Sequence, residues 1–467
     1  MAAPLEAIQA AEASMAASLD GLQAAEASLA RASLDNSSTD PYADEDRIER
    51  DLETLPSKAK GPALAALAAA VKASRASFDV DAAAFVALVV DGGLRCVDVR
   101  SPGEFARGHV PGAVNVPLFD DAERAQVGTA YKRKGRAEAM SLGMSKLAKK
   151  GGLGALAARA AGDAAAGARV CVHCWRGGLR SGAVAWLLRR RGFDAVVLRG
   201  GHRAYRAHLR SLWDPRAPQP RLVVVGGRTG VGKTRALGAL AAAGRQVLDL
   251  EALAKHRGSA FGWRAPQPTN EAYESLCGLA WRSLDPSRDV FVEDEEGHVG
   301  TALVPPPLYE LMRLAPVVLK IECACETRVA NLLEDYAEDA ARDPGAFDGR
   351  LRDATRKVSK RLGGDRTAEA LALLDARDLA GYARLLLERY YDKLYDKHLA
   401  ARARTDAAVL DVDAAHPFDA RAVAAGLVAA LDAHDAARGA AAPRAPPAFD
   451  DAVDDGDKGG PPWCAPS

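Results

Sequence analysis

The sequence predicts an α/β protein with two successive domains, each built on a parallel sheet that helices cover on both faces. From about Phe78 onward, short apolar runs alternate with helix-like segments, a pattern typical of parallel sheets. Two glycine-rich, basic loops follow such apolar runs, HCWRGGLRS at 173–181 and GGRTGVGKT at 226–234. Because each loop stands between a strand and a helix, each predicts an anion-binding site.

Composition restricts the class of protein. The 467 residues are 48% hydrophobic and 27% charged, as in ordinary globular proteins, and are enough for two or three domains. Lys+Arg and Asp+Glu both number 62, so any RNA contact has to use local basic patches. Seven cysteines without regular spacing indicate a reducing compartment, and no apolar stretch reaches the roughly 18 residues of a membrane span. We therefore expect no membrane contact.

Both ends of the chain have a biased composition. An Ala-, Ser- and acid-rich segment contains a duplicated phrase, at Gln9–Asp20 and Gln23–Asp35. Its acidic residues argue against an Arg-rich transit peptide, so we expect a cytoplasmic protein, with an organellar location left open. The end of the chain is rich in Ala, Pro, Gly and Asp, which is typical of disorder. The expected parts are a low-complexity tail and linker over 1–75, a first domain over 76–215, a second domain over 220–435 and a disordered tail over 436–467.

The first loop predicts a nucleophilic cysteine. Four strands are expected in the first domain: Leu94–Val99, Val114–Pro117, Arg169–Val172 and Ala195–Leu198. The third strand leads into Cys174, where converging backbone N–H groups and the start of the next helix favour a thiolate. Arg180 can fold back to hold a bound oxyanion. The remaining residues of the expected anion loop are Trp175, Arg176, Gly177, Gly178 and Ser181.

This motif leaves several chemistries open. Cysteine phosphatases use His-Cys-x5-Arg-Ser/Thr, which the segment from His173 to Ser181 matches, and rhodanese-type sulfurtransferases carry a persulfide on an equivalent cysteine. A third interpretation pairs Cys171 with Cys174 as half a metal site or a redox dithiol. No second Cys/His pair stands at zinc spacing, so Cys171 is expected to be a small buried hydrophobe.

An upstream segment favours one of these classes. RCVDVRSPGEFARGHVPGAVNVP, at 95–117, resembles the entry of a rhodanese domain. The resemblance implies a rhodanese-like parallel sheet for the first domain. Phosphatases of the cell-cycle type share that fold and remain an alternative.

The second loop is a full Walker A sequence. Its backbone amides are expected to cradle phosphates, while Lys233 reaches the distal phosphate and Thr234 is a candidate Mg²⁺ ligand. The expected phosphate-binding residues are Gly227, Thr229, Gly230, Gly232, Lys233 and Thr234. The second domain is therefore expected to be P-loop NTPase-like.

Carboxylates follow two strands of this second domain. Strands are expected at Leu222–Val225, Val290–Val292 and Val317–Ile321. Glu293 and Asp294 come directly after the second of these and form the candidate acidic site, with Asp249 and Glu251 as rivals. From Thr327 onward the pattern is helical, through the segments 327–336, 350–366 and 379–399.

Basic residues gather at several places in an otherwise neutral chain. Lys132 and Arg133 begin the run KRKGR, and Arg203 and Arg206 lie in GGHRAYR. A charge run is usually a solvated face. We nevertheless expect these residues, together with the basic stretch 350–366, to contact RNA phosphates.

Taken together, the motifs resemble those of tRNA 2-selenouridine synthases. The resemblance runs from about Val97 to Leu399 and includes HCWRGGLRS, GGHRAYR, GGRTGVGKT, VEDEEGHVG, KRLGGDR and LERYYDKLYD. It implies a transferase that converts the wobble 2-thiouridine of tRNA to 2-selenouridine with selenophosphate. It also implies S-geranylation of the same base from geranyl diphosphate as an intermediate step.

The same resemblance sets the expected ligands and partners. Selenophosphate and geranyl diphosphate are the expected co-substrates, with Mg²⁺ as a candidate ion. The expected partners are tRNA and an enzyme that supplies selenophosphate, and no other protein partner is indicated. Two alternatives remain: a rhodanese-like phosphatase or sulfurtransferase fused to an ATP-dependent kinase-like domain, and a persulfide carrier with a nucleotide switch.

Overall fold

The computed structural model describes residues 61–257, 266–402, 407–415 and 417–439. The expectations for residues 1–60 and for the tail after 439 lie outside these ranges. The chain divides into two compact units, one ending at His208 and the other beginning at Leu209, and each is described by itself. No helix of the described residues is long and apolar enough to cross a membrane.

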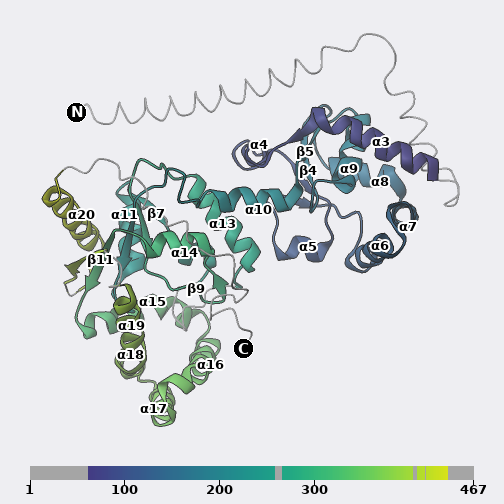
Figure 1. The fold of residues 1–467 in the computed structure, drawn as a ribbon. Coiled ribbons are helices and arrows are strands. Elements are labelled where there is room, and N and C mark those ends of the chain that lie inside the picture. Colours follow the sequence, from purple (N-terminus) through teal and green to yellow (C-terminus); the bar gives the residue numbers. More distant parts are fainter. Residues whose placement is uncertain (1–60, 258–265, 403–406, 416, 440–467) are drawn as a thin grey trace, which may run out of the picture. The chain divides into compact units, whose positions relative to one another are not determined.

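The first unit contains a parallel five-stranded sheet in the order β1-β5-β4-β2-β3, of which β4 and β5 are labelled in Figure 1. Its strands are β1 (Asp79–Val80), β2 (Cys96–Asp98), β3 (Val114–Asn115), β4 (Arg169–His173) and β5 (Asp194–Leu198). The four expected strands are confirmed. The edge strand β1 was not expected, because two residues are too few to form an apolar pattern.

Helices cover this sheet and close its core. They are α3 (Gly61–Phe78), α4 (Ala82–Val86), η2 (Ala87–Asp91), α5 (Pro102–Arg107), α6 (Asp121–Lys134), α7 (Arg136–Ala148), α8 (Gly152–Ala161) and α9 (Leu179–Arg190). Helix α10 (Gly201–Ser211) follows the last strand, and its final residues belong to the second unit. The core joins strand residues such as Val97 and Val172 to Leu156 of α8 and Leu187 of α9. Alternate residues of a parallel strand face opposite sides of the sheet, so both faces need such a cover.

Helix α3 moves the start of the first domain upstream of residue 76. The range 1–75 was expected to be tail and linker, but α3 begins at Gly61 and packs on α9 (Figure 1). Leu64, Leu67 and Val71 lie on the face of α3 that enters the core and are at most 5% exposed. The Ala-rich composition concealed this helix, because only three large apolar side chains mark its buried face.

The second unit has a parallel five-stranded sheet in the order β12-β11-β6-β8-β7. Its strands are β6 (Leu222–Gly226), β7 (Gln246–Leu248), β8 (Val290–Glu293), β11 (Val317–Glu322) and β12 (Ala408–Asp413), and a small hairpin joins β9 (His298–Val299) to β10 (Ala302–Leu303). Edge strand β12 lies in the part of the chain that was expected to be helical. Its exposed Asp411 and Asp413 alternate with Leu410 and Val412, and only pairing with β11 identifies this short pattern as a strand.

Apolar side chains of the central strand β6 divide between two cores. Val224 faces the core that contains Trp213 and Tyr273, whereas Val223 and Val225 face the core on the other side of the sheet. The covering helices are α11 (Lys233–Ala242), α12 (Leu250–Ala254), α13 (Asn270–Arg282), α14 (Pro306–Arg313) and α20 (Ala420–Ala437). This unit is therefore a three-layer α/β fold, as the Walker A sequence predicted.

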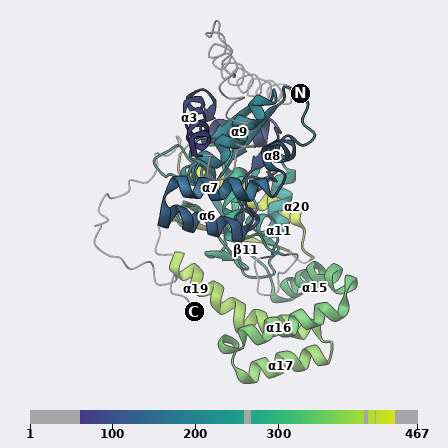
Figure 2. The same ribbon diagram turned by 90° about the vertical axis from the view of Figure 1, so that its right-hand side faces the viewer.

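A group of helices without strands extends from the second sheet. It consists of α15 (Cys325–Arg342), α16 (Pro344–Leu362), α17 (Gly364–Asp375), α18 (Leu379–Leu386), η3 (Leu387–Tyr391) and α19 (Asp392–Arg402), with α15, α16 and α17 side by side in Figure 2. It has a core of its own around Leu351, Leu374 and Leu386. The expected helical part is thus confirmed, and we call α15 to α19 the helical subdomain.

The position of α3 can be tested by its contribution to stability. Replacement of Leu67 with alanine removes buried methylenes and leaves a cavity, so we expect unfolding of the first unit to become easier by about 2 to 5 kcal/mol. The measurement is equilibrium unfolding in urea, with Ala69→Ser on the exposed side of the same helix as the control. Equal stability of Leu67→Ala and the parent protein would show that α3 is dispensable.

Candidate functional site

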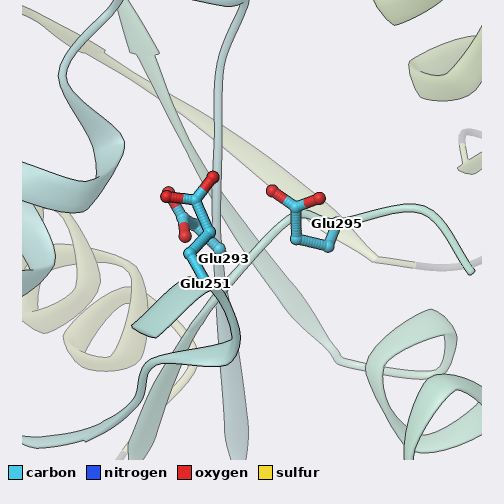
Figure 3. A group of neighbouring side chains, drawn as sticks. All are labelled: Glu251, Glu293 and Glu295. Atoms are coloured by element: carbon cyan, nitrogen blue, oxygen red, sulfur yellow. The ribbon is translucent and has the colours of Figure 1, made fainter. Parts of the chain in front are cut away.

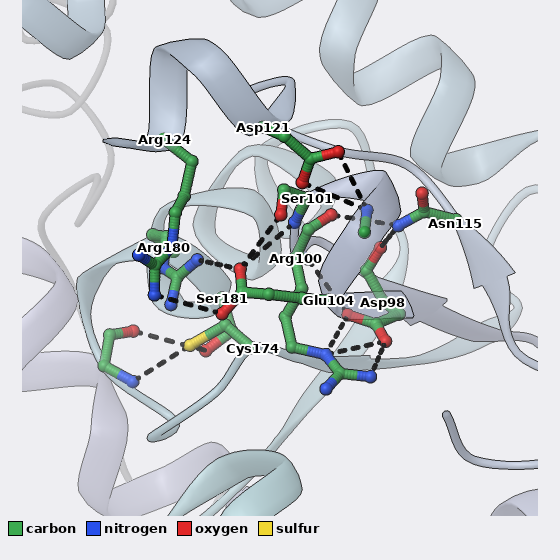
Figure 4. Close-up of polar contacts among 12 residues, drawn as sticks. Asp98, Arg100, Ser101, Glu104, Asn115, Asp121, Arg124, Cys174, Arg180 and Ser181 are labelled. Carbon is green, nitrogen blue, oxygen red and sulfur yellow. Dashed lines mark hydrogen bonds and ion pairs between the residues drawn. The ribbon is translucent and has the colours of Figure 1, made fainter. Parts of the chain in front are cut away.

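The Cys174 loop connects the end of β4 at His173 to the start of α9 at Leu179. Cys174 is only 2% exposed, and its Sγ lies 3.2 Å from Ser181 Oγ (Figure 4). The backbone N–H of Gly178 donates to the same sulfur at 3.4 Å. These two groups can stabilise negative charge on sulfur, as the loop sequence predicted for a thiolate nucleophile.

Two glycines, Gly177 and Gly201, allow backbone segments to pack closely around the Cys174 loop. Gly177 has φ +58°, and a Cβ at that position would lie 2.4 Å from the carbonyl oxygen of Leu198. A Cβ on Gly201 would lie 2.3 Å from the carbonyl oxygen of Cys174. His202 N–H then donates to that carbonyl at 2.8 Å, so the start of α10 is joined directly to the loop. The sequence GGHRAYR therefore supports the backbone of Cys174, the candidate nucleophile.

Arg180 lies in the first turn of α9 and faces a carboxylate from another element. Its Nη1 is 3.5 Å from Glu104 Oε2, and Arg124 of α6 reaches the other oxygen of Glu104 at 3.4 Å (Figure 4). Burial alone would raise the pKa of Glu104, but Arg180 and Arg124 hold it below its ordinary value. The ionised Glu104 thus orients two guanidinium groups beside the loop. Its place in the Ser101-to-Glu104 capping box was the signal in the sequence that could have identified it.

A buried ion pair lies beneath the loop. Arg100 donates to Asp98 Oδ2 at 2.7 Å and to the carbonyl of Gly108 at 2.7 Å, and both side chains are fully buried. Burial opposes ionisation of Asp98, yet the hydrogen bonds and the charge of Arg100 lower its pKa. Burial also lowers the pKa of His173, so this histidine is expected to be neutral and structural. The DVR motif therefore supports the loop's frame.

The remaining residues of the first loop differ in exposure. Arg176 is exposed, whereas Trp175 is half-buried, and its ring centroid lies 5.9 Å from that of His202. Cys171 is fully buried on β4, and burial raises the pKa of its thiol to about 12. Among the residues that the structure describes, no group of three metal-binding side chains includes Cys171 or Cys174. This favours the expected packing role for Cys171.

The expected RNA-binding residues in this unit lie on its surface. Lys132 and Arg133 end α6 and are exposed, and Gly135 separates them from α7. Arg203 is exposed on α10, whereas Arg206 is half-buried. These positions are accessible to a polyanion.

The phosphate loop joins β6 to α11 in the second unit. Gly227, Gly230 and Gly232 all have positive φ, and a Cβ on Gly227 would lie 2.7 Å from the carbonyl oxygen of Ile321. Lys233 Nζ donates to the carbonyl of Gly227 at 3.0 Å, which places its charge over the loop. The loop follows the carboxyl end of the central strand, where ligands of open α/β sheets bind.

Helices of the helical subdomain contact the back of the phosphate loop. Arg328 of α15 donates to the carbonyl of Thr229 at 2.8 Å, and Asn331 donates to that of Gly230 at 2.9 Å. From α19, the hydroxyl of Tyr395 accepts the N–H of Gly227 at 2.7 Å. Sequence reasoning assigned no role to Tyr395, although it lies in the motif LERYYDKLYD.

Three glutamates converge beside Thr234. Ligand oxygens of Glu251, Glu293 and Glu295 lie within 4.8 Å of one another (Figure 3). Thr234 Oγ1 is 2.8 Å from Glu251 Oε2 and 2.9 Å from Glu293 Oε1. Burial and mutual repulsion raise the pKa of both Glu251 and Glu293 to about 8. We call these three residues the glutamate cluster.

The glutamate cluster brings together Glu293 and Glu251, which the sequence left as alternatives for the acidic site. Glu293 comes from the end of β8 and Glu251 from α12, so strands adjacent in the sheet bring them together. Asp294, the other candidate, is instead hydrogen-bonded to His398 of α19 at 3.1 Å. Asp249 caps α12 by accepting the N–H of Ala252. Glu295 belongs to the run of carboxylates Glu293–Glu296 that follows the expected strand, but nothing in the sequence EDEE singled it out.

The glutamate cluster could hold a divalent cation. Its ligands are all oxygens, the donor type that Mg²⁺ prefers, and Oε2 of Glu293 is buried without a hydrogen-bond partner in the described part of the chain. Lys233, Thr234 and the cluster line a cavity of about 1070 Å³. Arg350, Lys357 and Arg361 of α16 line the same cavity, so basic side chains as well as the glutamates are available to a phosphorylated ligand and its cation.

Comparisons with known proteins identify both units. The rhodanese-like domain family matches residues 81–208, and the family of the tRNA 2-selenouridine synthase AAA domain matches residues 220–416. The tRNA 2-selenouridine synthase of Cupriavidus necator is 39% identical over 65% of this chain and 88% of its own length. Those of Cupriavidus pinatubonensis and Pseudomonas fluorescens are 37% and 36% identical and are covered to 88% and 87% of their lengths, over 65% and 64% of this chain. Since the thiol loop and the phosphate loop lie in the two domains that these matches cover, the chain belongs to the tRNA 2-selenouridine synthase family.

Proposed function

We propose that this protein converts the wobble 2-thiouridine of tRNA to 2-selenouridine, with selenophosphate as the selenium donor and an S-geranylated base as the intermediate. One observation carries the proposal: a buried thiol in a glycine-rich loop and a phosphate loop whose cavity is also lined by basic side chains of α16 occur in one chain of this family. The first suits transfer from a phosphorus compound, and the second suits a diphosphate.

The first step is assigned to the phosphate loop. The sulfur of 2-thiouridine attacks the terminal carbon of geranyl diphosphate, the C–O bond breaks, diphosphate leaves and the base loses its N3 proton. Lys233 and the loop amides bind the departing diphosphate, and a divalent cation in the glutamate cluster would neutralise part of its charge. Alkylation converts the sulfur into a leaving group.

The second step is assigned to the Cys174 loop. Selenium has the same oxidation state in selenophosphate and in selenouridine, so its transfer needs no reductant when a thiolate attacks phosphorus. The Cys174 sulfur then forms an S–P bond as the P–Se bond breaks, and the released selenide displaces geranylthiol from the base. Water hydrolyses the S–P bond to give phosphate. Arg180 and the amide of Gly178 are placed to bind the phosphoryl oxygens.

RNA binding is assigned to the exposed basic residues at the end of α6 and on α10. Lys132 and Arg133 are one part of this surface and Arg203 another. Because the chain as a whole has no net charge, such local patches have to supply the attraction for tRNA phosphates. An enzyme that makes selenophosphate is the proposed supplier of the donor.

Replacement of Cys174 separates the two steps. Cys174→Ser keeps the side-chain volume but offers a hydroxyl that is a poor nucleophile at neutral pH, so we expect 2-selenouridine to disappear and S-geranylated thiouridine to accumulate. The measurement is mass spectrometry of nucleosides from tRNA incubated with geranyl diphosphate and selenophosphate. Cys171→Ser is the matched control and should give both products. Full selenation by Cys174→Ser would exclude Cys174 as the nucleophile.

A substitution of Lys233 tests the first step, geranylation. Lys233→Ala removes the charge that meets the diphosphate, and we expect geranylation to fall at least about tenfold because a charge-assisted hydrogen bond is removed. The rate is measured with the same nucleoside assay. Geranylation at the parent rate would mean that the phosphate loop serves another ligand.

RNA binding through the end of α6 is tested by its salt dependence. Replacing both Lys132 and Arg133 with alanine should flatten the plot of log affinity for tRNA against log salt, by about 0.9 for each phosphate that the protein no longer neutralises. Lys149→Ala, an exposed change after α7, is the control and should keep the parent slope. An unchanged slope in the double variant would place the RNA elsewhere.

The glutamate cluster predicts a stability that depends on pH. Because the pKa values of Glu251 and Glu293 are raised to about 8, the folded state binds more protons than the unfolded state above the ordinary glutamate range. Their contribution to stability is complete below about pH 4.5 and is lost as pH rises through about 8. Without divalent cations, we therefore expect the melting temperature to fall as pH rises from about 5 to about 8.

Two comparisons isolate the cluster in that experiment. Glu293→Gln should reduce the fall in melting temperature, and Mg²⁺ should oppose it because a cation favours the ionised carboxylates. The same fall in Glu293→Gln and in the parent protein, with or without Mg²⁺, would contradict this assignment.

A further inference from the structure

A second cavity opens beside the phosphate loop within the helical subdomain. Its volume is about 270 Å³, and α15, α16, α18 and η3 form its walls. Apart from Thr229 of the phosphate loop, every lining side chain is Leu, Ala, Phe or Tyr. We call it the apolar pocket.

The apolar pocket continues into the phosphate-loop cavity. Six residues line both: Thr229, Leu332, Tyr336, Phe347, Leu351 and Tyr391. On one side of this shared wall lie Lys233 and the basic side chains of α16, and on the other side lies hydrocarbon. A ligand that fills both spaces has an anionic head and an apolar chain.

The hydroxyl of one lining tyrosine, Tyr382, is engaged in a buried hydrogen bond. Its oxygen is 2.7 Å from Thr355 Oγ1, so the ring of Tyr382 and not a free hydroxyl lines the pocket. A ribose or a nucleobase placed here would lose hydrogen bonds to water and find few replacements. The lining therefore disfavours the nucleoside part of a nucleotide.

We propose that the apolar pocket binds the hydrocarbon chain of a short prenyl diphosphate whose diphosphate lies on the phosphate loop, and that the pocket limits the chain length. This inference rests on the proposed use of geranyl diphosphate and adds the place of its chain. Its size supports the limit, because 270 Å³ lies just below the usual range for small-molecule sites. Each buried methylene strengthens binding by about 0.8 kcal/mol, or roughly fourfold.

Binding to the purified full-length protein tests the pocket without tRNA. Affinities for inorganic diphosphate, dimethylallyl diphosphate, geranyl diphosphate and farnesyl diphosphate are measured by calorimetry in the presence of Mg²⁺. We expect geranyl diphosphate to bind at least about tenfold more tightly than inorganic diphosphate, and farnesyl diphosphate to gain nothing further. Equal affinities for geranyl diphosphate and inorganic diphosphate would overturn the inference.

Two substitutions test whether the hydrocarbon chain of the ligand lies in the apolar pocket. Ala383 lines the pocket, so Ala383→Phe should reduce the affinity for geranyl diphosphate about tenfold and leave inorganic diphosphate unchanged. Unchanged diphosphate binding also shows that the variant is folded. Leu333→Gln, at a partly exposed lining position, should act in the same direction. Ala372→Phe on the exposed side of α17 is the matched control.

The outcomes separate this inference from the proposed reaction. If both lining variants bind every prenyl diphosphate as the parent protein does while tRNA is still geranylated, the pocket is not the chain site and the reaction stands. If binding depends on chain length as expected but no variant or parent protein geranylates tRNA, the pocket assignment stands and the proposed reaction falls.

Discussion

Close backbone approach is the constraint on which both candidate sites depend. Gly201 brings α10 against the carbonyl of Cys174, and Gly227 brings the phosphate loop against β11. At each place a Cβ would overlap a backbone oxygen, so a side chain could be accommodated only by moving the loop. The backbone amides of both candidate anion sites are thus held in position by these close backbone contacts.

Charged side chains then adjust what each loop can bind. In the first unit, Glu104 pairs with Arg180 and Arg124 near a buried thiol, so the candidate nucleophile lies in the same region as two positive charges. In the second unit, the glutamate cluster and Lys233 line the same cavity, so negative charges accompany the positive charge of the lysine. A diphosphate needs cations near it, so the cluster suits catalysis when it holds a cation of its own.

The helical subdomain links the phosphate loop to the apolar pocket. Arg328 and Asn331 bind carbonyls of the loop from α15, while neighbouring residues of the same helix, Leu332 and Tyr336, line the pocket. A shift of α15 would therefore change both spaces at once. This arrangement explains why the motif LERYYDKLYD, far from the Walker A sequence in the chain, belongs to the same site.

Local patterns predicted most of the architecture. Apolar runs located β4, β6 and β8, because a strand buried on both faces is continuously hydrophobic. The sequence pattern did not predict strands β1 and β12. Edge strands are short or partly exposed, so only their pairing with a neighbouring strand identifies them. Helix α3 was not predicted as part of the first domain, because its buried face has only a few large side chains among alanines.

The sequence by itself determined which residues are the candidates for chemistry, because the spacing within HCWRGGLRS and GGRTGVGKT is local and follows from strand-loop-helix geometry. Tertiary structure decided which distant groups join them. Glu104, Tyr395 and Glu295 acquired candidate roles only when separate elements met, and the choice between Glu251 and Asp294 depended on the order of strands in the sheet. No pattern within one segment contains that information, since a carboxylate's partner and its burial are properties of the packed fold.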